Sequence, residues 1–254
     1  MVDKKTPVDG DKPRRAPGKK GRRPGRPAAD EKGGVDRRSI LQKALNLTKT
    51  VALQDLSIVV VARSLNVTPA LIHYYIGGRD WLTSGVMNLF YKGLIRKWPK
   101  ETGDWEQDVR NSTKAFFDHL IQYPGIAAYL VMNHQFRVFQ LTAFRDRDYG
   151  AEVLDRAIGH IRAAGLSAKR TGIHSQLINE FVMTTAHQAS HALLPADHRQ
   201  FLEDKLASLD PTRTENIVFG KVAPLEMSAD TLFEEGMSVF LLGMHRDREI
   251  EGVS

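Results

Sequence analysis

His187 and His191 lie four residues apart in a segment with helical periodicity, a spacing at which two histidines can bind one metal ion. A metal site needs a third ligand, and the sequence does not dictate one. Gln188 follows His187 directly, so the H-E-x-x-H motif of zinc hydrolases is absent. We therefore expect both histidines to pack in a pocket or at an interface, and we expect neither a metal nor a cofactor.

The chain also lacks the patterns that enzyme catalysis requires. It contains no cysteine, no G-x-S-x-G motif, no phosphate-binding loop and no dinucleotide-binding glycine run. Paired carboxylates occur only in clusters typical of a solvated surface, at Asp146 with Asp148 and at Glu234 with Glu235. The sequence thus predicts that the protein is not an enzyme.

Basic residues gather toward the amino terminus. Residues 1–35 carry 11 Lys or Arg against 5 Asp or Glu, residues 36–98 carry 9 against 3, and residues 99–254 carry 16 against 22. This asymmetry indicates that a polyanion such as DNA meets only the amino-terminal part. Composition alone leaves open a charge gradient that has no partner.

Residues 1–34 are rich in Pro, Gly, Lys and Arg and have no hydrophobic period, which predicts a disordered basic arm. Arg22, Arg23 and Arg26 belong to the run KKGRRPGRP, which resembles an AT-hook, a peptide that enters narrow A·T minor grooves. An ordinary basic tail that adds only non-specific affinity is the alternative. The arm lacks the apolar stretch of a secretion signal, and no apolar run is long enough to cross a bilayer, so we expect a cytoplasmic protein without membrane contact.

Beyond the arm, apolar residues recur at helical spacing almost everywhere, which predicts an all-α fold. Residues 36–49 form the first expected helix, and Ser57 is a good N-cap for a second. The β-branched run 58–61 has strand propensity, but the spacing of the whole segment favours a helix. Thr68 and Pro69 open a third, short helix.

A Pro- and Gly-containing stretch at 99–104 predicts a domain boundary, with a helix-turn-helix domain over 35–98 and a helical domain over 99–254. The other helices are expected at 79–98, 105–123, 124–139, 151–164, 167–194, 197–209 and 228–247, with a loop at 210–227.

The short second and third helices, joined by a tight turn at Asn66, predict a helix-turn-helix whose second helix enters the major groove of DNA. Ile72 and Ile76 would face the core, whereas Tyr74 and its neighbours project outward, where they suit base-edge and phosphate contacts. A three-helix cluster with no role in DNA binding is the alternative. The expected DNA-contacting residues are Ser57, Thr68, Pro69, Ala70, His73, Tyr74 and Arg79, with Arg22, Arg23 and Arg26 of the arm.

The run LSIVVVARSLNVTPALIHYYIGGRDWL, from Leu56 to Leu82, resembles the DNA-binding signature of the TetR family of bacterial regulators. That signature has a hydroxyl residue opening one helix, a V-A-x-x-x-G-V core and S-P-x-x-L-Y-x-H-F in the next helix. The resemblance covers residues 36–98, and the segment Leu232–Met244 is similar to the closing F-x-x-G-L-x-x-L-L-x-G-L helix of the family. It implies a homodimeric regulator, by default a repressor, that a small molecule releases from a palindromic operator.

Four positions depart from the family pattern. His73 stands where the family usually has a tyrosine that contacts the DNA backbone, and Ile76 replaces a core phenylalanine. Asn66 takes the place of a turn glycine and tolerates the left-handed conformation next best. Val59 occupies a position where arginine often touches phosphate. These differences put the operator sequence and the role of His73 in doubt, but not the fold.

The resemblance also implies a dimer interface and a cavity for a small, largely apolar effector in the carboxy-terminal domain. The last helix would pack with the 167–194 helix against a second copy, with burial inside one chain as the alternative. Aromatic and methionine residues at helical spacing are more often core than pocket. The expected interface residues are Phe233, Met237, Phe240, Leu241 and Met244; the expected pocket residues are Phe116, His119, Tyr129, Met132, Asn133, Phe136, Arg137, Met183 and His187.

A non-specific architectural DNA-binding protein that relies on the basic arm is the alternative function. A sequence-specific dimer should prefer its palindromic site over random DNA by about 10³-fold or more, and this preference distinguishes the two.

Overall fold

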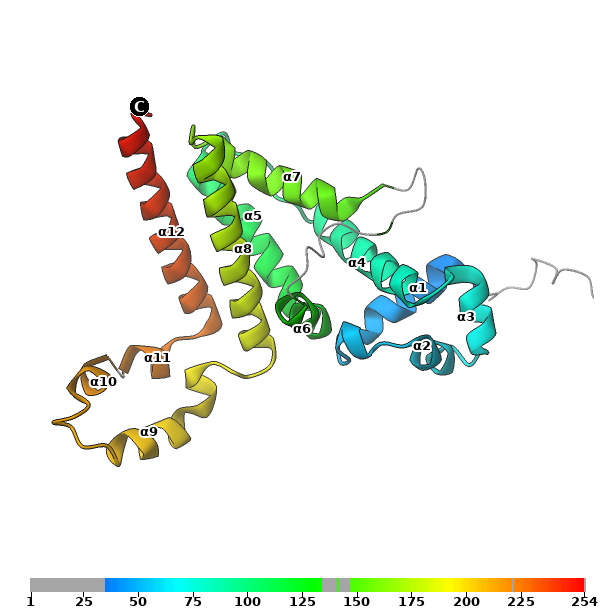
Figure 1. Cartoon of the computed structure of the whole chain (residues 1–254), viewed down its shortest axis with the longest axis horizontal. Helices are drawn as coiled ribbons and strands as arrows, with labels where there is room; N and C mark the ends of the chain where they lie inside the picture. The colour runs from blue at the N-terminus through cyan, green and yellow to red at the C-terminus, as the bar shows by residue number, and fades with distance from the viewer. Residues whose placement is uncertain (1–34, 134–140, 142–146, 221, 254) are drawn as a thin grey trace, which may run out of the picture. The chain divides into compact units, whose positions relative to one another are not determined.

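The protein's computed structural model describes residues 35–133, 141, 147–220 and 222–253, and every regular element in these ranges is helical (Figure 1). The all-α fold expected from the sequence is therefore confirmed for the described part of the chain. Six of the residues singled out above lie outside these ranges: Arg22, Arg23, Arg26, Phe136, Arg137 and Asp146.

The amino-terminal helices begin at hydrogen-bonded caps. The Asp36 carboxylate accepts a bond from the Ser39 backbone N–H at 2.7 Å and opens the first helix. A Pro at the first helical position, Pro69, opens the third. These helices are α1 (Arg37–Leu47), α2 (Ile58–Ser64), α3 (Pro69–Ile76) and α4 (Arg79–Ile95), with the 3₁₀ turn η1 (Leu53–Asp55) before α2.

The turn between α2 and α3 has the geometry that its sequence predicts. Asn66 has a φ of 55°, in the left-handed region that a turn glycine would occupy, so the expectation for this substitution is confirmed. Gly77 ends α3 with a φ of 99°, a conformation that strains any residue with a side chain. The backbone turn that joins α2 to α3 and the end of α3 are thus each set by a residue suited to positive φ.

The remaining helices are α5 (Trp105–Ile121), α6 (Pro124–Met132), α7 (Tyr149–Arg162), α8 (Ala168–Ser190), the turn η2 (Pro195–His198), α9 (Arg199–Ala207), α10 (Glu215–Gly220), α11 (Val222–Glu226) and α12 (Ala229–Glu251). The loop expected at 210–227 is wrong in part, because it contains α10 and α11. Pro224 does not prevent α11, since it lies in the first turn, where a missing N–H breaks no helical bond.

α8 is the central helix of the carboxy-terminal part and packs against α5, α6, α7 and α12, the last of which runs beside it in Figure 1. Phe233 of α12 stacks on Phe117 of α5 with ring centroids 4.8 Å apart, and both rings are fully buried. Burying such a ring contributes about 2 kcal/mol, so α12 is firmly held on its own chain.

α4 links this part to the helix-turn-helix, because it packs against α1 on one side and α7 on the other. Val35–Ser254 form one compact unit. The boundary expected at 99–104 falls in the loop between α4 and α5, and the division into two domains stays a prediction. In the part of the chain that the structure describes, no helix is both long and apolar enough to span a bilayer.

Candidate DNA interface and cavity

The outer face of α3 carries the residues expected to read DNA. Tyr74 is 75% exposed and meets Tyr75 edge to face, with ring centroids 5.1 Å apart, whereas Ile72 and Ile76 are buried as expected. His73 donates from Nδ1 to the Gly77 carbonyl oxygen at 2.8 Å, since a carbonyl only accepts. That bond fixes the His73 ring over the end of α3, while the Tyr74 phenol projects into solvent.

The residues that open α2 and α3 cap these helices and are also among those expected to contact DNA. The Ser57 hydroxyl accepts from the Val60 N–H at 3.2 Å, and the Thr68 hydroxyl accepts from the Leu71 N–H at 3.4 Å. Ala70 is small and exposed, so the start of α3 can approach a groove closely. Ser57 and Thr68 thus cap the two helices of the motif.

Arg79, at the start of α4, has a partner within the chain: its guanidinium donates to the Gln54 carbonyl oxygen in η1. This bond ties the start of α4 to the segment before α2. The phosphate contact expected of Arg79 stays a prediction, since a guanidinium has further N–H donors. Val59, exposed on α2, offers no charge where the family often has arginine.

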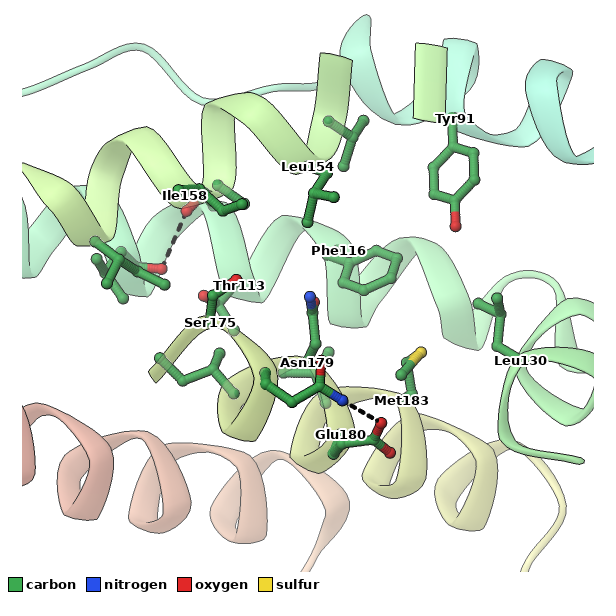
Figure 2. A pocket seen from close by; sticks show the side chains of 18 of the residues that line it. Tyr91, Thr113, Phe116, Leu130, Leu154, Ile158, Ser175, Asn179, Glu180 and Met183 are labelled. Carbon is green, nitrogen blue, oxygen red and sulfur yellow. Dashed lines mark hydrogen bonds between the residues drawn. The ribbon is translucent and has the colours of Figure 1, made fainter. Parts of the chain in front are cut away.

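A cavity of about 440 Å³ lies between α4, α5, α6, α7 and α8 (Figure 2). Its wall is largely apolar: in the close-up, Leu154 and Ile158 of α7 face Phe116 of α5, with Leu130 of α6 at one side. This size and polarity are typical of a site for a small molecule. Most of the apolar lining comes from α5, α6 and α7, with Ile178, Val182 and Met183 of α8.

Polar groups enter this cavity from three helices, and Ser112 and Thr113 of α5 are among them. The Tyr91 hydroxyl points into it from α4, and burial raises the pKa of this phenol, which keeps it a neutral hydrogen-bond donor. Ser175, Asn179 and Glu180 line it from α8, where Gln176 Nε2 donates to Glu180 Oε1 at 2.8 Å. A bound molecule would therefore meet a polar strip along α8 and a hydroxyl opposite it.

Two of the expected pocket residues, Phe116 and Met183, line the cavity. The others that the structure describes do not line it, and an effector contact for them stays a prediction. Met132 is 63% exposed, and the Asn133 amide bonds back to the Tyr129 carbonyl oxygen at 3.0 Å, closing α6. Sequence proximity does not decide which side chains line the cavity, because residues next to a cavity-facing position on a helix turn by about 100° to another face. The described residues that do not line the cavity are His119, Tyr129, Met132, Asn133 and His187.

His119 is buried in the core between α4 and α5. It stacks on Phe90 with ring centroids 4.5 Å apart, and its Nε2 donates to the Phe90 carbonyl oxygen at 3.0 Å. Desolvation lowers the pKa of His119 to about 4, so the ring is neutral at pH 7. Its role in this structure is to pack α5 on α4.

Most of the cavity residues that were not expected come from α8 and α7, and those of α7 are apolar. The α7 residues follow the i, i+3, i+4 pattern, which is a recognisable signal of a buried face but does not distinguish core from cavity. Tyr91 was missed because α4 belongs in sequence to the helix-turn-helix. The α7 residues that line the cavity are Val153, Leu154, Ala157, Ile158 and Ile161.

The expected dimer residues of α12 face their own chain. Phe233, Met237, Leu241 and Met244 are buried inside one chain, as the alternative expected, so their side chains are not exposed to a second copy. Phe240 is half-buried, with its ring centroid 5.4 Å from that of Phe181 in α8. The strongest apolar stripe of α12 packs on α5 and α8 because those helices complete the core of the protomer.

The histidine pair at the end of α8 is close but forms no metal site in the described residues. The ring centroids of His187 and His191 lie 4.4 Å apart. The pKa of His187 is lowered, most by its burial and next by the nearby His191. His191 Nδ1 donates to the His187 carbonyl oxygen at 3.0 Å, which uses one ring nitrogen in the helix end. Within the described ranges, no group of three or more His, Asp or Glu side chains is placed to hold a metal ion.

The amino end of α6 connects the cavity helices to the helix-turn-helix. The Gly125 N–H donates to the Thr48 carbonyl oxygen, just after α1, at 2.8 Å. A Cβ on Gly125 would overlap the Val51 carbonyl oxygen, so only glycine permits this approach. Two segments far apart in sequence thus meet backbone to backbone.

Known proteins resemble this chain in sequence and in fold, although no protein-family model matches it. It is 22% identical over 145 residues to the HTH-type transcriptional repressor Rv1353c of Mycobacterium tuberculosis and to the HTH-type transcriptional regulator Mb1388c of Mycobacterium bovis. The match covers 57% of this chain and only 53% of the length of these relatives.

Solved structures agree over more of the chain. Apo ActR of Streptomyces coelicolor matches with a TM-score of 0.70 and 20% identity, over 85% of this chain and 98% of ActR. The TetR family protein ActR in complex with actinorhodin matches with a TM-score of 0.67 and 19% identity, over 87% and 99%. BioQ of Mycobacterium smegmatis gives a TM-score of 0.54 at 14% identity, over 84% and 99%. The chain therefore has the fold of the TetR-family transcriptional regulators.

Proposed function

We propose that this chain is a ligand-responsive, sequence-specific transcriptional regulator of the TetR family, a cytoplasmic repressor that a small, largely apolar effector releases from DNA. One observation carries the proposal: a capped helix-turn-helix with an exposed aromatic face belongs to the same compact unit as a largely apolar cavity of about 440 Å³. Neither feature alone distinguishes a regulator from other helical proteins.

DNA recognition is assigned to α3 and its cap. Tyr74 projects from α3 into solvent, and the start of α3 presents small residues to a groove. The net positive charge of residues 1–98 would attract the phosphate backbone and add salt-dependent affinity, including a contribution from the arm. The acidic remainder of the chain would stay away from DNA.

Effector recognition is assigned to the cavity, and two routes couple it to α3. Tyr91 lines the cavity on α4, whose first residues follow α3 directly. Leu130 lines it on α6, whose first turn bonds to Thr48 beside α1. A ligand that fits one arrangement of α4 and α6 better than another would shift the population of DNA-competent protein by that difference in affinity.

A homodimer is part of the proposal, because a palindrome is read by two copies. The contact surface is assigned to the outer flank of the α8–α12 pair, which carries exposed apolar side chains on both helices. Val239 and Leu242 are 67% and 69% exposed, unusually high for aliphatic residues in long helices. We call this flank the outer α8–α12 face; it consists of Ile173, Leu177, Val239, Leu242 and Ile250.

The test is a selection of randomised duplex DNA on the full chain at fixed salt, followed by sequencing of the retained molecules. An inverted repeat bound about 10³-fold more tightly than random DNA is expected. Retention without a motif, or of A·T-rich tracts alone, would contradict the proposal and indicate an architectural role for the arm. A selected operator then allows a screen for small molecules that release it.

A further inference from the structure

Among the described residues, the cavity between α4 and α8 is lined by an acidic side chain and by no basic one. Among the described residues that line it, Glu180 carries the only acidic side chain, and none is Lys, Arg or His. Its other polar groups are neutral hydroxyls and amides, including those of Tyr91 and Asn179. Whatever enters this cavity meets a single negative charge and no positive one among these residues.

The position of Glu180 makes this charge available to a ligand. The side chain lines the cavity from α8 and is exposed to solvent, and Gln176 orients its carboxylate by donating to Oε1 at 2.8 Å (Figure 2). A carboxylate has two oxygens, and this bond occupies one of them. Asn179, one turn away from Ser175, extends the polar strip into the cavity.

We infer that the cavity binds an amphiphilic amine: an aromatic or aliphatic body packed against Phe116, Leu154 and Ile158, with a protonated amine placed at Glu180. This inference rests on the proposed function, because it names the chemical class of the effector. An ammonium gains a charge-assisted hydrogen bond at Glu180. An anion of the same shape would leave its charge unpaired and would be repelled, since transfer of an unpartnered charge out of water is unfavourable.

Three probes of one shape test the charge preference without DNA: 2-(1-naphthyl)ethylamine, 2-(1-naphthyl)ethanol and 1-naphthylacetate. Titration calorimetry of the full chain should give about five-fold tighter binding for the amine than for the alcohol, the size expected for a partly exposed ion pair. The acetate should bind more weakly than the alcohol. The preference for the amine should shrink as salt is added, because ions screen the pair.

Glu180→Gln keeps the shape and the hydrogen bond to Gln176 while removing the charge, so amine and alcohol should then bind alike. Glu235→Gln removes an exposed carboxylate from α12, outside the cavity, and should leave the preference intact. Ala157→Phe, which fills the cavity, should weaken all three probes and so verifies where they bind.

Equal binding of amine and alcohol to the unaltered chain, or a preference for the acetate, overturns the inference and leaves the proposed regulator standing. Binding of none of the three probes overturns the inference together with the effector half of the proposed function. The DNA half is judged separately by the operator selection, so the two failures are distinguishable.

Discussion

The helix-turn-helix and the cavity show two ways of building a recognition surface. The first is made from consecutive residues between Ser57 and Arg79, its caps are satisfied within that stretch, and Arg79 bonds to Gln54 just before it. The second draws its wall from five helices between Tyr91 and Met183. A surface that docks on a polymer needs exposure and local rigidity, whereas a cavity for a small molecule needs distant segments to pack around it.

This difference predicts where each region is vulnerable. Substitutions on the outer face of α3 should change DNA affinity and leave the fold alone, because those side chains make few contacts with the protomer. Substitutions around the cavity should affect stability, because their neighbours belong to the core. The following predictions test that contrast, beginning where the two regions touch.

Gly125→Val should have the largest effect. The new side chain would overlap the Val51 carbonyl oxygen, with its Cβ also 2.7 Å from the Thr48 carbonyl oxygen, and backbone atoms cannot move aside cheaply. We expect a loss of about 4 kcal/mol or more in the free energy of unfolding, measured by urea denaturation. Gly159→Ala is the matched control: nothing lies within 4 Å of its Cβ, and helix propensity predicts a gain of up to about 1 kcal/mol. Equal stability of both variants would mean that α6 does not depend on this contact.

The local character of the helix-turn-helix is also the reason that sequence predicts it well. Thr68 is followed by proline, Asn66 sits at the turn, and both signals act within four residues, so the caps and the positive φ are those expected. The outward position of Tyr74 follows from helical periodicity once the start of α3 is known.

The cavity and the dimer surface depend on long-range packing that periodicity does not encode. An apolar stripe such as Phe233–Met244 can bury against its own chain or against a second copy, and the pattern is the same in both cases. His119 and Phe116 are one turn apart on α5, yet one packs on Phe90 and the other lines the cavity. Only the positions of α4, α7 and α8 decide between these outcomes.

Disrupting the outer α8–α12 face should have the next largest effect, on assembly. Leu177→Glu combined with Val239→Glu places two charges on a surface that would be apolar and covered in a dimer. We expect the mass in solution, measured by light scattering, to fall from that of two chains to that of one. Affinity for the selected palindrome should fall by about 10³-fold, since each copy then binds alone. Phe201→Glu, equally exposed on α9 but outside this face, is the control. A variant of unchanged mass would remove the α8–α12 flank from the interface.

His119 should make the cavity region sensitive to mild acid. Its pKa in the folded protein is about 4, against an ordinary value of 6.5, so between these pH values the unfolded chain binds a proton that the folded chain does not. The free energy of unfolding therefore falls as the pH falls through this window, by about 3 kcal/mol in total. His119→Gln should flatten the dependence of the free energy of unfolding on pH, measured by urea denaturation between pH 6.5 and 4, whereas His198→Gln, at an exposed site, should not.

The Asp108 carboxyl, whose pKa is lowered by hydrogen bonds from Thr102, loses its contribution to stability only at lower pH. An unchanged slope in His119→Gln would show that the ring accepts a proton without unfolding.

Tyr74→Ala should have the smallest effect on the protomer and a clear effect on DNA. The side chain is mostly in solvent, and its aromatic contact with Tyr75 is at the surface, so the free energy of unfolding should change by less than about 0.5 kcal/mol. Loss of one contact to the duplex should weaken operator binding by about ten-fold or more at constant salt. Phe201→Ala removes a similarly exposed aromatic ring from α9 and should leave operator affinity unchanged.

If Tyr74→Ala binds the operator as well as the unaltered chain, Tyr74 does not belong to the DNA-contacting surface. If it unfolds the protein instead, the exposed face of α3 contributes to the core, and the contrast between the two regions fails.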